Sequence, residues 1–66
     1  MISYKPLWKT LIDRDMTKEH LRTGIGASHS TIAKMGKEQY VALEILDKIC
    51  TFLNCEISDV IMHKKE

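Results

Sequence analysis

Apolar residues recur along this 66-residue chain at intervals of three and four, while the alternation typical of strands is weak. The first apolar stripe comprises Leu7, Trp8, Leu11 and Ile12. Pro6 stands just before it, and proline is favoured in a first helical turn because its missing N–H would be unpaired there. The pattern therefore predicts a first helix that begins around Pro6 and ends near Asp15.

A second helix is predicted between two residues that favour helix ends. Thr17 is a good N-cap because its hydroxyl can accept a hydrogen bond from a free backbone N–H of the first turn. Leu21 and Ile25 lie four residues apart and form the inner face. Gly26 supplies the left-handed backbone conformation that stops a helix and turns the chain.

A third short helix follows immediately, over residues 28–36. Ser28 is its predicted N-cap, and Ile32 and Met35, three residues apart, are its predicted buried positions. Gly36 closes the helix. Residues 37–40 then form a loop.

The last third of the chain predicts one long helix and one short one. The long helix covers residues 41–53, and its inward stripe comprises Leu43, Leu46, Ile49, Cys50 and Leu53. Asn54 is a suitable stop. Ser58 is expected to cap a final short helix whose Val60, Ile61 and Met62 pack on the core. The tail from His63 to Glu66 is expected to fray.

Together these elements predict an all-α fold, a compact five-helix domain that spans residues 1–66. The length allows one domain with a thin core, because a chain of this size buries only about 60% of its unfolded surface. A hydrophobic fraction of 44% and a charged fraction of 29% are ordinary for a folded domain and argue against disorder.

The segment over residues 18–37 carries the most specific pattern, KEHLRTGIGASHSTIAKMGK. Two short helices that cross at a sharp turn need a glycine at the turn and small or apolar residues on both sides of it. The apolar positions of the segment are Leu21, Ile25, Ala27, Ile32 and Met35, with Gly26 at the turn. This pattern resembles the helix-turn-helix of Cro- and lambda-repressor-like (XRE family) regulators, and GASHSTIAK is similar to that family's G-[small apolar]-S-x-S-T-I-x-[KR].

Two positions depart from the family pattern. Arg22 occupies the fifth position of the motif, where the family has a small residue at the closest approach of the two helices. We expect its long side chain to extend out of the crossing toward solvent, with a looser crossing as the result. Ala27 is smaller than the valine or isoleucine usual at its place.

The resemblance implies that the third helix enters the major groove of double-stranded DNA. The residues implied to face base edges are Ser28, His29, Ser30, Ala33 and Lys34. Serine and histidine hydrogen-bond with several bases, the Ala33 methyl suits a thymine methyl, and Lys34 suits a guanine or a phosphate. The implied contacts to the DNA backbone are Thr17, Lys18, Thr31 and Lys37.

The distribution of charge supports a polyanionic partner more than the net charge of +1 does. Residues 1–37 carry seven basic and three acidic side chains, whereas residues 38–66 carry three basic and six acidic ones. A domain polarised in this way presents its basic half to nucleic acid. A random scatter of surface charge remains the alternative.

Other classes of protein find little support. No apolar run approaches the roughly 20 residues of a membrane span, and the N-terminus lacks a signal-peptide pattern, so we expect a cytoplasmic protein. Cys50 and Cys55 are expected to pack as small hydrophobic residues. The histidines, at positions 20, 29 and 63, fit no zinc spacing, and we expect no metal and no cofactor.

Catalysis is also not expected. Ser28 and Ser30 flank His29, but nothing supplies an orienting acid or an oxyanion hole, and no phosphate-binding glycine loop is present. No small-molecule ligand is evident either.

We therefore predict a sequence-specific DNA-binding transcriptional regulator, a repressor that occupies its operator as a homodimer on an inverted repeat. The candidate dimer residues, each of which could equally be core, are Tyr40, Val41, Phe52, Ile57 and Ile61. The open alternative is a helix-turn-helix used as a protein-interaction module, such as an anti-repressor or an antitoxin-like subunit. The dependence of duplex binding on salt separates the two.

Overall fold

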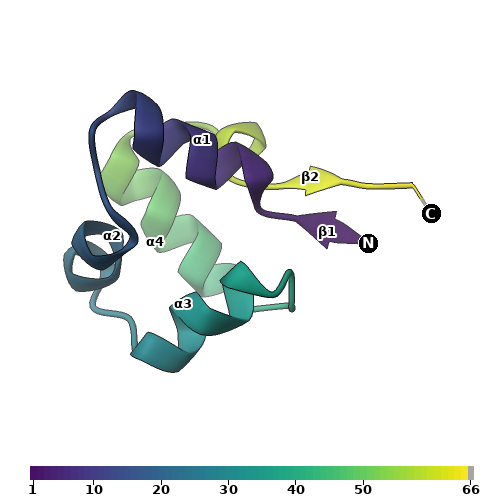
Figure 1. The fold of residues 1–66 in the computed structure, drawn as a ribbon, viewed down its shortest axis with the longest axis horizontal. Coiled ribbons are helices and arrows are strands. Elements are labelled where there is room, and N and C mark those ends of the chain that lie inside the picture. The colour runs from purple at the N-terminus through teal and green to yellow at the C-terminus, as the bar shows by residue number, and fades with distance from the viewer. Residues whose placement is uncertain (66) are drawn as a thin grey trace.

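Four α-helices and a short two-stranded ribbon form the fold in the computed structural model, which describes residues 1–65 (Figure 1). The helices are α1 (Lys5–Asp13), α2 (Lys18–Ile25), α3 (His29–Gly36) and α4 (Leu43–Leu53). A 3₁₀ turn, η1 (Ile57–Asp59), follows α4, and strand β1 (Ile2–Ser3) pairs with β2 (Met62–His63). In Figure 1, α1 and α3 lie at opposite ends of the helical body, and the ribbon extends away from it.

The caps of α2 are those that the sequence predicts. The Thr17 hydroxyl accepts the His20 N–H at 3.1 Å, and His20 Nδ1 accepts the Thr17 N–H at 3.2 Å. This is a capping box in which histidine takes the place of the usual Glu or Gln. Gly26 ends the helix with φ 68°, a left-handed conformation that costs a residue with a Cβ about 1–2 kcal/mol.

The ends of the other helices also follow local chemistry. Ser28 accepts the Thr31 N–H at 3.2 Å and thereby caps α3. Asn54 ends α4 in the left-handed conformation, as predicted. Two helices are shorter than expected. Helix α1 ends at Asp13 rather than near Asp15, and α4 begins at Leu43 rather than at Val41.

The core lies between the helices and includes Val60, which follows η1. Its buried residues are Tyr4, Leu7, Leu11, Leu21, Ile25, Ala27, Met35, Leu46, Ile49, Leu53 and Val60. Ile32, expected to be buried, is half-buried. The expectation was wrong for Ile12 and Leu43, which are 73% and 76% exposed. Each stands at the free end of its helix, Ile12 in the last two residues of α1 and Leu43 at the start of α4, where no neighbouring element covers it.

The predicted fifth helix does not form. Three residues make the 3₁₀ turn η1, and its cap is Glu56 with Asp59, not Ser58. Val60 is fully buried, but the chain then becomes extended, so Ile61 is half-buried and Met62 is exposed. Tertiary pairing with β1, 60 residues away in the sequence, overrides the local helical pattern.

The ribbon also overturns the expectation of a frayed tail. His63 is opposite Ile2 in the antiparallel register, and the Lys64 N–H donates to the Met1 carbonyl at 2.7 Å. Each end of the chain therefore holds the other. Glu66, the last residue of the predicted tail, lies outside the described residues.

Side-chain and backbone contacts fasten α1 to the C-terminal part of the chain. The Leu7 N–H donates to the Val60 carbonyl at 3.2 Å, and the Thr10 hydroxyl donates to the Asp59 carbonyl at 3.0 Å. Arg14, which follows α1, donates to the carbonyl of Leu53 at the end of α4. These bonds satisfy carbonyls that would otherwise lack partners at helix and turn ends.

Candidate nucleic-acid interface

Helix α3 presents one polar face to solvent. It follows α2 across the turn at residues 26–28, and its inner face contributes Met35, which is fully buried. The predicted base-contact residues Ser28, His29, Ser30, Ala33 and Lys34 are all exposed. The structure therefore brings this predicted set together on the outer side of one helix and its cap.

The hydroxyls at the start of α3 already bond with one another. Ser28 Oγ lies 3.0 Å from Ser30 Oγ and 3.0 Å from Thr31 Oγ1, in addition to its bond with the Thr31 N–H. Ser28 is therefore committed to capping the helix. Thr31, the expected backbone contact, is half-buried beside it, whereas Ser30 is open to solvent.

The cationic group of Lys18 has a defined place in the structure. Its Nζ lies 4.4 Å from the centre of the Trp8 ring, a cation–π contact that joins the start of α2 to α1. A Cβ added at Gly36 would be 4.0 Å from the same Nζ, so this ammonium also lies close to the end of α3. Lys37, which caps the C-terminus of α3, is exposed.

Arg22 does not extend freely into solvent, as was expected of it, but is held at the turn between α2 and α3. Its side chain is 21% exposed, and its guanidinium bonds in two directions. Nε donates to both carboxylate oxygens of Glu19 at 3.1 Å, and Nη1 donates to the Ala27 carbonyl at 3.2 Å. Arg22 thus joins α2 to the turn that precedes α3.

The hydrogen-bonded pair of Glu19 and Arg22 shifts the pKa of both residues. The hydrogen bond from Arg22 lowers the pKa of Glu19, and the nearby His29 and His20 lower it further. The same hydrogen bond raises the pKa of Arg22.

Residues near both termini of the chain bond to the loop after α3. The buried Tyr4 donates its hydroxyl to the Gln39 carbonyl at 2.8 Å. Glu38, at φ 56°, lies 3.4 Å from Lys64 Nζ, and a hydrogen bond from Ser3, followed by this lysine, lowers the pKa of Glu38. Sequence reasoning missed these supports, because the partners lie 26 to 35 residues apart and no local pattern links them.

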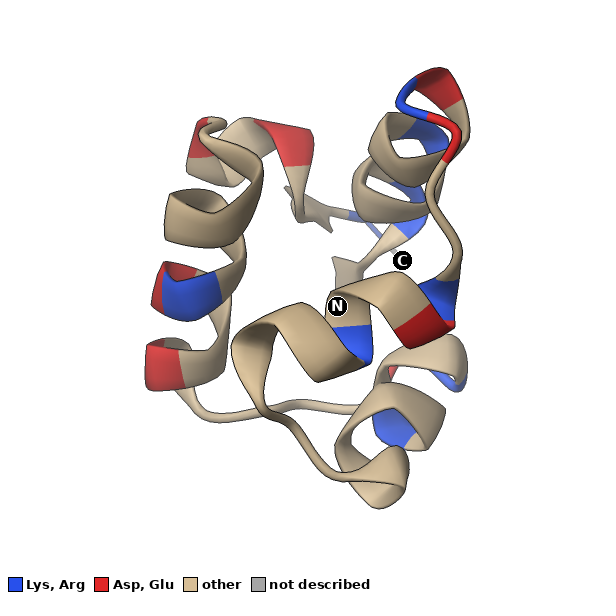
Figure 2. Ribbon diagram, turned by 90° about the vertical axis from the view of Figure 1, so that its left-hand side faces the viewer, with Lys and Arg blue, Asp and Glu red and all other residues tan. Residues whose placement is uncertain are grey.

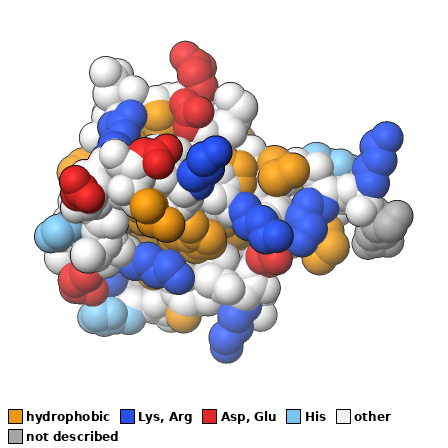
Figure 3. Space-filling view, turned by 45° about the horizontal axis from the view of Figure 1, so that its top comes forward, with side chains coloured by type: hydrophobic (Ala, Val, Ile, Leu, Met, Phe, Trp, Pro, Cys, Tyr) orange, Lys and Arg blue, Asp and Glu red, His pale blue; other side chains and the backbone are white. Residues whose placement is uncertain are grey.

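Charge is distributed unevenly over the elements. In Figure 2 the acidic positions of α4 and of the segment after it lie on the opposite side from α1 and α3. Lys34 is the one charged residue within α3. The face in Figure 3 nevertheless mixes basic, acidic and hydrophobic side chains rather than showing one continuous basic field.

Comparison with known proteins agrees with this geometry. The family described as the Cro/C1-type HTH DNA-binding domain matches residues 6–66. The chain belongs to this family. A crystal structure of the transcriptional regulator VanUg is 51% identical in sequence, with a TM-score of 0.94 over 98% of this chain and 87% of that one. No curated protein matches significantly.

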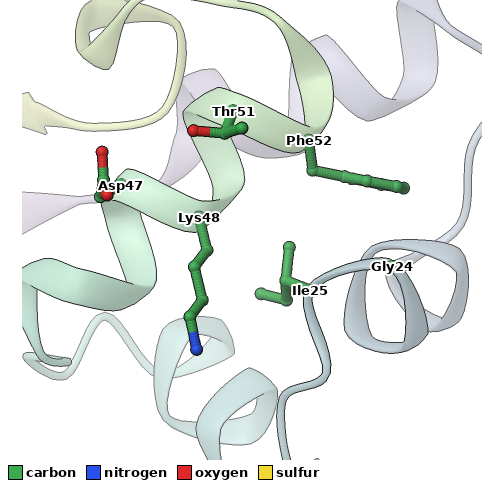
Figure 4. Close-up of a pocket in the computed structure, with 6 residues that line it drawn as sticks. All are labelled: Gly24, Ile25, Asp47, Lys48, Thr51 and Phe52. Carbon is green, nitrogen blue, oxygen red and sulfur yellow. The ribbon is translucent and has the colours of Figure 1, made fainter.

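A shallow pocket of about 350 Å³ lies between α2 and α4 of this HTH domain (Figure 4). It is lined by Gly24, Ile25, Asp47, Lys48, Thr51 and Phe52. The Phe52 ring points toward Gly24, and a Cβ there would overlap it. The pocket is therefore the margin of a helix contact in which glycine makes room for an aromatic ring.

The remaining candidate residues for chemistry do not form a site. Cys50 and Cys55 are free, half-buried and packed against the core, as expected. Burial raises the pKa of Cys55, and the Cys50 thiol raises it further, which favours the protonated thiol over the more nucleophilic thiolate. Within residues 1–65 no group of three or more His, Cys, Asp and Glu side chains could hold a metal, and no helix is long and apolar enough to cross a membrane.

The candidate dimer residues divide into two sets. Val41 and Ile61 pack against the core, whereas Tyr40, Phe52 and Ile57 are 74%, 42% and 46% exposed. Tyr40, Phe52 and Ile57 are therefore the more exposed members of the set.

Proposed function

We propose that this Cro/C1-type HTH domain is a sequence-specific repressor that inserts α3 into the major groove of its operator. The observation that carries the proposal is the exposed outer face of α3, with His29, Ser30, Ala33 and Lys34 directed away from a core that Met35 anchors. Ser28, the remaining member of the proposed base-contact set, supports that face as the helix cap. The 51% identity with a transcriptional regulator supports a regulatory role.

Contacts with the DNA backbone would flank this helix. Thr17 and Lys18 stand at the N-terminus of α2, where free N–H groups and the helix dipole favour a phosphate. Thr31 and Lys37 stand on the flank and at the end of α3. The Trp8 ring holds the Lys18 ammonium at this position before DNA arrives, which lowers the entropy cost of a phosphate contact.

Two copies on an inverted repeat would supply the affinity that one module lacks. A single small module buries about 600–1,000 Å² on DNA, whereas family members place two modules on half-sites one helical turn apart. Such a repressor acts on DNA in the cytoplasm, and residues 1–66 would form its DNA-binding unit.

Selection of bound sequences from a random duplex pool tests the proposal. We expect a preferred site with two symmetric halves, and an affinity that falls steeply with salt because each neutralised phosphate contributes about −0.9 to the slope of log K against log salt. Absent or salt-insensitive binding would instead support a protein-interaction module.

The triple variant His29→Ala, Ser30→Ala, Lys34→Ala tests the role of α3 on the selected site. We expect it to lose most of the preference for that site over an unrelated duplex, since each good base contact is worth about 1–3 kcal/mol. Lys48→Ala is the matched control, because it removes one exposed lysine from α4, where Lys48 pairs with Glu44. Unchanged operator affinity in the triple variant would contradict the placement of α3.

A further inference from the structure

The residue that departs most from the helix-turn-helix pattern also makes the most polar contacts around the turn. We propose that Arg22 is a positioning residue that fixes the start of α3 through reciprocal hydrogen bonds with Ala27, and so sets the sequence selectivity of the domain without contacting DNA. This inference rests on the proposed function, in which α3 contacts base edges.

The bonds between Arg22 and Ala27 close a ring. The Ala27 N–H donates to the Arg22 carbonyl at 3.0 Å, and Arg22 Nη1 donates to the Ala27 carbonyl at 3.2 Å. Ala27 is 9% exposed, so its methyl is packed while both of its backbone polar groups bond to the same residue. Its carbonyl belongs to the peptide plane that leads into Ser28, the cap of α3. Fixing that plane fixes the direction in which α3 begins.

Glu19 holds the guanidinium in place for this role. It lies one turn earlier on α2 and accepts from Nε through both carboxylate oxygens, while Nη2 also faces Glu19 Oε1. The planar guanidinium can donate to the carboxylate and the turn carbonyl at once, because its donors form a rigid fork. A lysine ammonium is a point charge on a flexible stem and lacks this fork.

The same pairing argues against Arg22 as a phosphate ligand. Its charge is neutralised by Glu19, and to reach a phosphate it would have to leave both Glu19 and the Ala27 carbonyl. The two roles predict different salt dependence. Loss of a phosphate ligand lowers the magnitude of the salt slope by about 0.9, whereas loss of a positioning residue leaves it unchanged.

The experiment compares the wild-type protein with Arg22→Ala, Arg22→Lys and Glu19→Gln on the selected operator and on an unrelated duplex. We expect Arg22→Ala to lower operator affinity about tenfold, the scale of one lost hydrogen bond from a charged donor, and to leave the affinity for the unrelated duplex and the salt slope unchanged. Arg22→Lys keeps the charge but lacks the fork of donors, so it should lose selectivity as Arg22→Ala does. Glu19→Gln, which keeps one acceptor oxygen and leaves Arg22 in place, should retain most of the wild-type selectivity.

Amide hydrogen exchange supplies a second measurement that needs no DNA. Arg22→Ala and Arg22→Lys should speed exchange at the Ala27 and Ser28 amides while amides within α4 keep their protection. If Arg22→Ala does not fold, the lysine and glutamine variants carry the comparison. A salt slope reduced by about 0.9 would show a phosphate ligand, and an unchanged ratio of operator to unrelated duplex would also overturn the inference.

Failure of this inference is distinguishable from failure of the proposed function. If the triple variant of α3 loses its preference for the operator but Arg22→Ala does not, only the role of Arg22 is wrong. If no duplex binds or the triple variant has no effect, the proposed function is wrong.

Discussion

At the scale of single residues, the polar contacts of this domain concentrate at helix ends and turns. Thr17 and His20 cap α2 reciprocally, and Ser28 caps α3. The Glu19–Arg22 pair then extends this local network across the turn to Ala27. Two of these capping residues, Thr17 and Ser28, are also proposed to contact DNA. The residues that begin α2 and α3 are therefore also part of the proposed interface.

The lowered pKa of Glu19 predicts a loss of stability in acid. A carboxyl whose folded pKa lies below its ordinary value contributes stability above that value, 4.5, and the contribution is lost as the pH falls through the lower folded pKa. Thermal unfolding of the wild-type protein and of Glu19→Gln should therefore differ at neutral pH, and the difference should shrink in acid. A difference that stays constant well below pH 4.5 would contradict the pairing with Arg22.

At the scale of elements, α2 is the helix that joins the others. It contacts α3 across the turn and α4 along its side. Gly24 lets the Phe52 ring of α4 lie against the backbone of α2, which places the helix that supports α3 directly on the core helix. The ribbon and the Tyr4–Gln39 bond then hold the exit of α3 from the opposite side.

Gly24→Ala tests the contact between α2 and α4. Alanine in place of glycine inside a helix gains about 0.5–1 kcal/mol of stability, but here its methyl would displace the Phe52 ring. We expect the full gain only in a Phe52→Ala background, with a smaller gain or a loss in the wild-type background. The measurement is denaturant unfolding of the two single variants and the double variant, and strict additivity would contradict the contact.

At the scale of the whole molecule, a small core must stabilise everything else. By the usual range per residue, a 66-residue domain has a free energy of unfolding of about 3–10 kcal/mol. The interface on α3 therefore depends on a few fully buried side chains, including Leu21 of α2, Met35 of α3 and Ile49 of α4. The pairing of β1 with β2 also orders both segments through backbone hydrogen bonds and needs no additional buried side chains.

Ile49→Ala should destabilise the domain by about 2–5 kcal/mol, because Ile49 is fully buried and its truncation loses burial and leaves a cavity that the surroundings fill only in part. Ile12→Ala is the matched control, since this isoleucine is 73% exposed, and we expect a change within about 0.5 kcal/mol. Urea unfolding measures both. Equal effects would show that Ile12 is buried in solution, as its helical spacing alone suggests.

The sequence predicted most of the local structure because that structure rests on local chemistry. Thr17 and Ser28 begin α2 and α3 through hydroxyl acceptors, and Gly26 and Asn54 end α2 and α4 with a left-handed backbone. Each acts within a few residues of its own position. The exposed face of α3 likewise follows from helical spacing around Met35. These interactions need no knowledge of the rest of the chain.

Tertiary structure alone decided which apolar residues are covered and how the ends of the chain are used. Ile12 and Leu43 fit an apolar stripe, yet both are exposed, and the predicted last helix gives way to strand β2 (Met62–His63) because β1 offers backbone partners there. Arg22 shows the same division within the motif. The sequence marked it as too long for the crossing, but only the folded chain places its guanidinium between Glu19 and the Ala27 carbonyl, because those acceptors come together only when α2 and the turn pack in three dimensions.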